Sequence, residues 1–163
     1  MCLWVVMRKL QKIFAAFFII FSTSAFADFS GAWHIEHPKS SVVTKIVDEF
    51  NIYLMQEGTI VCGFHYGTGR GKSKLDWGWA YEDRPTVTGH VTSSNTAYIV
   101  LHSSHSSNPI EALITIQKGE LLWLAKNSKA ELPPTIPESA TLAHATLKGE
   151  ELRELKNCSA NDT

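Results

Sequence analysis

The segment 75–84 gathers aromatic and charged side chains more densely than any other part of the sequence. Trp77, Trp79 and Tyr81 share a parity, so on a strand they project from one face. Such a row is either a buried wall of the core or an exposed stripe that stacks on a ligand or partner, with Arg84 in its polar rim. The segment therefore supplies four candidate contact residues.

The sequence contains no complete motif for metal binding or for nucleophilic catalysis. His102 and His105 supply two ligands at a strand end and His90 a possible third, but zinc needs three or four in fixed geometry, and histidines are also common in solvated loops. The Gly-x-Ser-x-Gly nucleophile signature is absent. Residues 71–73 imitate the end of a phosphate loop, but Tyr66 stands where its first glycine is needed. We therefore expect no catalytic residues, no metal, no cofactor and no enzyme activity.

The amino-terminal segment has the layout of a secretory signal peptide. An apolar run over 13–21 follows three basic residues and precedes Ala25-x-Ala27. The run is too short to cross a membrane, which needs ~20 apolar residues. We expect a signal peptide over 1–27, with translation starting at Met1 or Met7, and a periplasmic or secreted product.

The exported product is a single mildly acidic domain. Its 136 residues carry 12 basic and 16 acidic side chains, a net charge of −4. Nucleic acids and anionic membranes demand clustered cations, so neither is expected as a partner after signal cleavage. A chain of this length buries one core.

Export also changes the cysteine chemistry. Cys2 leaves with the signal peptide, and Cys62 and Cys158 remain. Two cysteines in an oxidising compartment favour one disulfide over two buried thiols.

Short strands joined by tight turns dominate the remaining sequence. One predicted hairpin joins 51–56 to 59–64 around Glu57-Gly58, with Cys62 opposite Tyr53. Further strands are expected over 31–37, 77–81, 87–91 and 96–103. Residues 42–50 suit either an amphipathic helix or an extended segment.

A second predicted hairpin joins 110–117 to 120–125 around Lys118-Gly119. Its register places Ile114 opposite Trp123 on an apolar face. Together these elements predict an all-β fold, an antiparallel meander of about eight strands closed into a small barrel or stacked as a sandwich.

The carboxy-terminal part completes this predicted architecture. We expect a β-barrel domain over 28–147, closed by a strand over 140–147, and a short helix followed by a tail over 148–163. In that helix Leu152 and Leu155 would face inward and cover the outside of the first hairpin.

Three short motifs resemble those of the lipocalin- and avidin-type β-barrels, the calycin group. They are Ser30-Gly-Ala-Trp33, Leu54-x-Gln-x-Gly58-x-x-Val61-x-Gly63 and Thr88-Gly-His-Val91. The resemblance covers residues 29–128 and implies that Trp33 closes the floor of a barrel. The long proline-containing tail departs from the avidin pattern, whereas lipocalins carry a carboxy-terminal helix outside the barrel.

These features together predict binding rather than turnover. The first hypothesis is an exported protein that holds a small apolar or amphipathic ligand in the barrel. The alternative is a periplasmic inhibitor or immunity protein whose protein partner is a toxin or a cell-wall-degrading enzyme. A hollow barrel would favour the first, and a filled barrel with an exposed aromatic patch the second.

Overall fold

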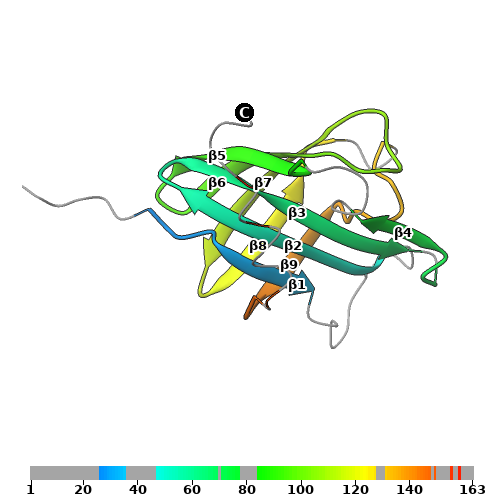
Figure 1. Cartoon of the computed structure of the whole chain (residues 1–163), viewed down its shortest axis with the longest axis horizontal. Coiled ribbons are helices and arrows are strands. Elements are labelled where there is room, and N and C mark those ends of the chain that lie inside the picture. The colour runs from blue at the N-terminus through cyan, green and yellow to red at the C-terminus, as the bar shows by residue number, and fades with distance from the viewer. Residues whose placement is uncertain are drawn as a thin grey trace, which may run out of the picture.

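Nine antiparallel strands account for most of the described chain. The computed structural model describes residues 26–35, 47–69, 71–77, 84–127 and 131–147, together with 149, 155 and 158 (Figure 1). The strands are β1 Gly31–Ile35, β2 Val47–Glu57, β3 Ile60–Gly69, β4 Lys74–Trp77, β5 Val87–Ser93, β6 Thr96–Leu101, β7 Ile110–Gln117, β8 Glu120–Ala125 and β9 Ser139–Ala145.

Eight of these strands close into a barrel. The order runs β2-β1-β9-β8-β7-β6-β5-β3, and pairing of β2 with β3 completes the circle. Strands that are consecutive in the chain are neighbours, apart from β4, which is an extra strand paired with β3. The predicted all-β meander is confirmed, as a barrel rather than a sandwich, and at this coarse level it fits a lipocalin-like architecture.

The β7–β8 hairpin has the predicted register. Ile114 lies opposite Trp123, and the turn residues Lys118 and Gly119 both have positive φ, at 55° and 84°. Two left-handed residues suit a two-residue turn whose twist matches the strands. The conformation of this turn therefore fixes the register of β7 and β8.

The β2–β3 hairpin corrects a predicted register. Glu57 pairs with Ile60, so the turn residues are Gly58 and Thr59, and Cys62 lies opposite Met55 rather than Tyr53. The physical reason is that Gly58, with φ 61°, takes the first position of the turn, where a left-handed residue is needed. The faces of β3 are unchanged, because the register moves by an even number of residues.

The two ends of the barrel differ in how the strands are joined. Three two-residue turns follow β2, β5 and β7 at one end, which we call the turn end. Among the described residues, the connections after β3, β6 and β8 begin at the opposite end, which we call the loop end. Figure 1 shows β4 beside the far part of β3, away from β5.

Large apolar side chains from every strand of the barrel form its core. The largest that are fully buried include Trp123, Phe50, Ile52 and Ile114. The rings of Phe50 and Trp123 meet edge to face at 5.0 Å between centroids. These inward-facing side chains pack against one another in the interior.

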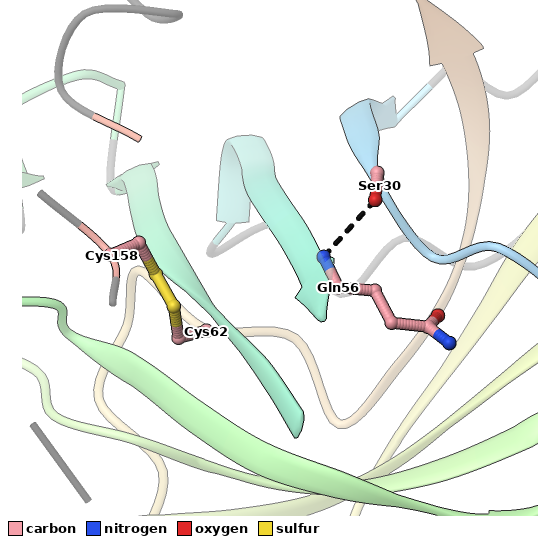
Figure 2. The surroundings of a disulfide bond; sticks show 4 residues. All are labelled: Ser30, Gln56, Cys62 and Cys158. Carbon is pink, nitrogen blue, oxygen red and sulfur yellow. Dashed lines mark hydrogen bonds between the residues drawn. A yellow bond between two sulfur atoms is a disulfide. The ribbon is translucent and has the colours of Figure 1, made fainter. Parts of the chain in front are cut away.

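Residues just before and within β1 pack at the turn end. Phe29 is fully buried, and its carbonyl oxygen accepts a hydrogen bond from Trp33 Nε1 at 2.9 Å. Gln56 Oε1 accepts from the Phe29 backbone N–H, and the Gln56 N–H donates to Ser30 Oγ at 3.0 Å (Figure 2). Trp33 is 3% exposed and belongs to the core; its role in closing this end stays a prediction.

The carboxy-terminal segment reaches the outer face of β3. Cys62 and Cys158 lie together with their Cα atoms 5.9 Å apart, within the span of a disulfide, and Figure 2 shows the bond. Both cysteines are buried, and so is Leu155. This placement agrees with the predicted pair and with cover by Leu155.

Other predicted elements are only partly described. The closing strand is confirmed as β9, and both β9 and β6 end two residues earlier than predicted, at Ala145 and Leu101. The predicted end of the first strand at His37 lies outside the described residues. Val47 and Phe50 lie in β2, so this part of 42–50 is extended. The signal peptide up to residue 25, residues 36–46, and most of the helix over 149–157 with Leu152 fall outside the described residues. In the described part of the chain, no helix has the length and apolar character to cross a membrane.

Candidate functional site

An exposed apolar surface lies on the outside of the barrel at the loop end. Among the described residues, four large apolar side chains are more than a third exposed, and two of them, Leu75 at 48% and Trp77 at 38%, share one face of β4. Trp77 lies opposite Tyr66 on β3, and the two rings meet edge to face at 6.2 Å. We call Tyr66, Leu75 and Trp77 the β4 surface.

Polar side chains border this surface. On β2, Asn51 lies opposite Tyr66, and Glu49 lies opposite Thr68, the β3 partner of Leu75. Lys72, in the turn before β4, donates to Glu49 Oε1 at 2.7 Å, and its backbone N–H donates to Asp48 Oδ2. An aromatic and aliphatic centre with a charged rim is the composition of a protein contact surface.

The structure describes two of the four predicted contact residues. Trp77 is exposed on the outer face, as a contact residue must be. Arg84 is also exposed, in the segment before β5. Trp79 and Tyr81 lie outside the described residues; of the predicted strand over 77–81 only Trp77 is described, and it lies in β4.

Directly behind Trp77, on the inner side of the wall, lies a buried carboxylate. Asp76 is fully buried and pairs with Gly67 across the β3–β4 ladder. Its Oδ2 accepts from Ser103 Oγ and from Thr135 Oγ1, the latter at 3.0 Å. Its Oδ1 accepts from the backbone N–H and the hydroxyl of Ser104, each at 2.9 Å. Asp76 thus ties β4 to both the β6–β7 and the β8–β9 connections.

His65, also fully buried, completes this Asp76 cluster. Its Nε2 lies 3.3 Å from Asp76 Oδ1, an ion-pair contact rather than a well-aligned hydrogen bond. Its Nδ1 lies 2.9 Å from Thr86 Oγ1, and its backbone N–H donates to the same oxygen at 3.3 Å. His65 therefore contacts residues from both β4 and the segment that leads into β5.

These contacts keep Asp76 ionised. Burial by itself raises the pKa of a carboxyl group, but the contact with His65 and the hydrogen bonds from Ser103 and Ser104 outweigh burial and hold the pKa of Asp76 well below its ordinary range. A buried carboxylate with this many donors is stabilised as the anion.

The chain from Thr86 through His65 to Asp76 has the order of a hydroxyl, a base and an orienting acid. In an enzyme this order activates the hydroxyl as a nucleophile. Here the Thr86 oxygen already accepts the His65 backbone N–H, and the imidazole and carboxylate are fully buried. We therefore interpret the cluster as a structural network.

The histidines considered as metal ligands are dispersed. His105 Nε2 donates to the Leu75 carbonyl oxygen at 2.9 Å, His90 packs its ring against Tyr98, and His102 is exposed. Across the described segments, no group of three or more His, Cys, Asp or Glu side chains is placed to hold a metal ion.

Sequence reasoning missed the Asp76 cluster, although one signal pointed to it. If Trp77 faces outward, parity turns Asp76 inward. The same alternation places His65 on the inner face of β3 with Val61. A carboxylate and an imidazole that both face a core need each other or other buried partners. The donors Ser103, Thr135 and Thr86 come from distant connections, and nothing local in the sequence indicates them.

Comparison with protein-family profiles, with curated proteins and with solved structures finds no match to this chain.

Proposed function

We propose that this chain is an exported, non-enzymatic binding protein of the periplasm or the cell exterior that contacts a protein partner through the β4 surface. The observation that carries the proposal is the exposure of Leu75 and Trp77 side by side on a paired strand, with Trp77 packed against Tyr66. Aromatic residues on a rigid element give contact area at little cost in conformational entropy. Such residues dominate the energetics of protein interfaces.

The interior of the barrel favours this protein partner over a small apolar ligand. The inward-facing residues near its middle are large and buried, among them Phe50, Ile99 and Trp123. A ligand held inside would have to displace these packed side chains, which costs free energy in a densely packed core. A protein that blocks a toxin or a wall-degrading enzyme needs only a complementary outer surface, so we place this chain in the inhibitor or immunity class.

We also propose that the barrel is of the calycin type. Its support is the order of the strands, each paired with the next in the chain around the closed barrel, and the position of Gly31-x-Trp33 at the start of β1. Trp33 points into the core near the turn end and bonds to the backbone of Phe29, as the resemblance to that group implies.

Site-specific photo-crosslinking in the producing cells tests the binding proposal. The photoreactive amino acid p-benzoylphenylalanine is placed at Leu75 or, as a matched control, at Leu124, which is equally exposed at 48% on β8. We expect a discrete protein adduct from position 75 and none from position 124. Equal adducts from both positions, or none from either, would contradict a contact at the β4 surface.

A second experiment separates the two hypotheses about the partner. The dye 1-anilinonaphthalene-8-sulfonate reports accessible apolar cavities, and mass spectrometry of a solvent extract of the purified protein reports a resident ligand. We expect no stoichiometric dye binding and no ligand from the native protein. A bound small molecule displaced by the dye would instead support the ligand-binding hypothesis.

A further inference from the structure

Three consecutive residues of the β6–β7 connection, Ser103, Ser104 and His105, contact β4. On the inner side of the wall, the Ser103 hydroxyl donates to Asp76 Oδ2, and the backbone N–H and hydroxyl of Ser104 donate to Asp76 Oδ1, each at 2.9 Å. At the strand itself, Nε2 of His105 lies 2.9 Å from the carbonyl oxygen of Leu75. The connection is thus held against β4 by contacts from all three residues.

The contact with Leu75 fixes which nitrogen of His105 carries the proton. A backbone carbonyl oxygen can only accept a hydrogen bond, so Nε2 is the donor. In the neutral imidazole the other nitrogen, Nδ1, is then an acceptor. Among the described residues no group forms a hydrogen bond or ion pair with Nδ1, and His105 is exposed. The surface therefore presents one acceptor of defined chemistry beside Leu75.

The backbone of His105 is fixed as well as its ring. Its N–H donates to Ser103 Oγ at 3.1 Å, and that hydroxyl itself donates to the buried carboxylate of Asp76. Ring and backbone are both held in place before any partner arrives. A side chain that is ordered in advance loses little conformational entropy on binding, which favours its use as a contact.

We propose that the contact surface continues from β4 onto the β6–β7 connection, where His105 accepts a hydrogen bond from the partner through Nδ1. This inference rests on the proposed function, because it extends the β4 surface to a second element. The partner that it fits is a protein with an N–H or O–H donor beside the apolar group that covers Leu75 and Trp77. A directional polar contact at the border of an apolar centre is the usual arrangement of a protein interface.

Two substitutions separate a contact role of His105 from a structural one. His105→Gln places an amide N–H near the position of Nε2, so it keeps a donor for the Leu75 carbonyl oxygen but removes the acceptor at Nδ1. His105→Leu removes both groups. His102→Gln is the matched control, since His102 is an exposed histidine of the same connection whose side chain makes no hydrogen bond to β4 among the described contacts.

The measurement is a titration of each purified chain, with p-benzoylphenylalanine at Leu75, into an envelope extract of cells that lack this protein. The readout is the concentration that gives the half-maximal yield of the discrete adduct. We expect His105→Gln and His105→Leu to raise it by about three- to tenfold, because one hydrogen bond at the interface is lost. His102→Gln should leave it unchanged.

Two measurements on the unbound chain accompany the titration. At a pH where the ring is neutral, a long-range proton–nitrogen NMR correlation should place the His105 proton on Nε2. Urea denaturation should show that His105→Gln is as stable as the wild type, since the bond to Leu75 is kept.

The inference is overturned if His105→Gln gives the same half-maximal concentration as the wild type, if His102→Gln raises it equally, or if the His105 proton lies on Nδ1. An unfolded His105→Gln would make His105 a structural residue and reject the inference too. If His105→Leu does not fold, His105→Gln decides alone. No adduct from the wild type at Leu75 would instead reject the proposed function itself.

Discussion

The two ends of this barrel are built by different means. At the turn end, two-residue turns join the strands, and Phe29 and Trp33 pack there with one buried hydrogen bond between them. At the loop end, Asp76 receives donors from two long connections and contacts His65 of β3. The turn end combines two-residue turns with hydrogen bonds between Gln56 and the residues that precede β1, whereas at the loop end one carboxylate collects donors from several connections.

This difference bears on where function lies. Two-residue turns leave few residues outside the strands that they join. The loop end presents the β4 surface on its outside and needs a buried polar network to hold the connections in place. Satisfied buried networks rigidify the elements that they join.

The largest expected effect is that of Asp76→Ala. It leaves the hydroxyl groups of Ser103 and Thr135 without their acceptor and removes the ion-pair contact of His65. This should lower the free energy of unfolding by ~3 to 5 kcal/mol. Urea denaturation measures it. Asp28→Ala is the control at the turn end, since Asp28 is exposed and accepts only the Ser30 N–H among the bonds described; it should cost under ~1 kcal/mol. Similar losses in the two variants would contradict the comparison between the ends.

The next effect is that of removing the cysteine pair. The double variant Cys62→Ser, Cys158→Ser opens a loop of sequence separation 96 and should cost ~2 to 4 kcal/mol. Non-reducing peptide mapping of the exported protein provides the direct check. Two alkylatable thiols in the native protein would show that the carboxy-terminal segment is not covalently tied to β3.

A smaller effect is expected for Trp33→Phe at the turn end. The substitution keeps an aromatic ring but leaves the buried Phe29 carbonyl oxygen without the Nε1 donor. One unsatisfied buried acceptor costs ~1 to 3 kcal/mol. Thermal unfolding measures it, and a loss as large as that of Asp76→Ala would mean that the turn end depends on a polar contact as much as the loop end does.

The pH dependence of stability isolates the carboxylate itself. The pKa of Asp76 is lower in the folded chain than in the unfolded chain, so its contribution is complete above the ordinary carboxyl pKa of ~3.9 and is lost as the pH falls toward the folded value. The difference in unfolding free energy between wild type and Asp76→Asn should be constant from pH 7 to 5. Below that it should shrink by at most ~1.4 kcal/mol per pH unit. A difference that does not change down to pH 2 would show that Asp76 is not held as the anion.

Much of the turn end was predictable from sequence. The Lys118-Gly119 turn set the register of β7 and β8, because two residues with positive φ close a hairpin in one way. The β2–β3 turn was placed one residue too early, because Gly58 was assigned the second turn position when it occupies the first. The parity of each strand, which decides the core face, survived this error.

The loop end was predictable only in part. The aromatic row that includes Trp77 was recognised, but the sequence left open whether it is buried or exposed, and the partners of Asp76 did not follow from any local pattern. Ser103 lies 27 residues away from Asp76, and Thr135 lies 59 residues away. Hydroxyl donors in long connections carry no periodic signal, so their meeting at one carboxylate depends on the closed barrel.

The central claim is that the outside of the loop end, at the β4 surface, contacts a protein partner. The most direct measurement is the amount of protein captured from an envelope extract of the producing cells by immobilised wild type, Trp77→Ala and Leu124→Ala, each shown by urea denaturation to be folded. We expect capture of one discrete protein to fall by about tenfold or more in Trp77→Ala and to be unchanged in Leu124→Ala. Unchanged capture by folded Trp77→Ala would contradict the account.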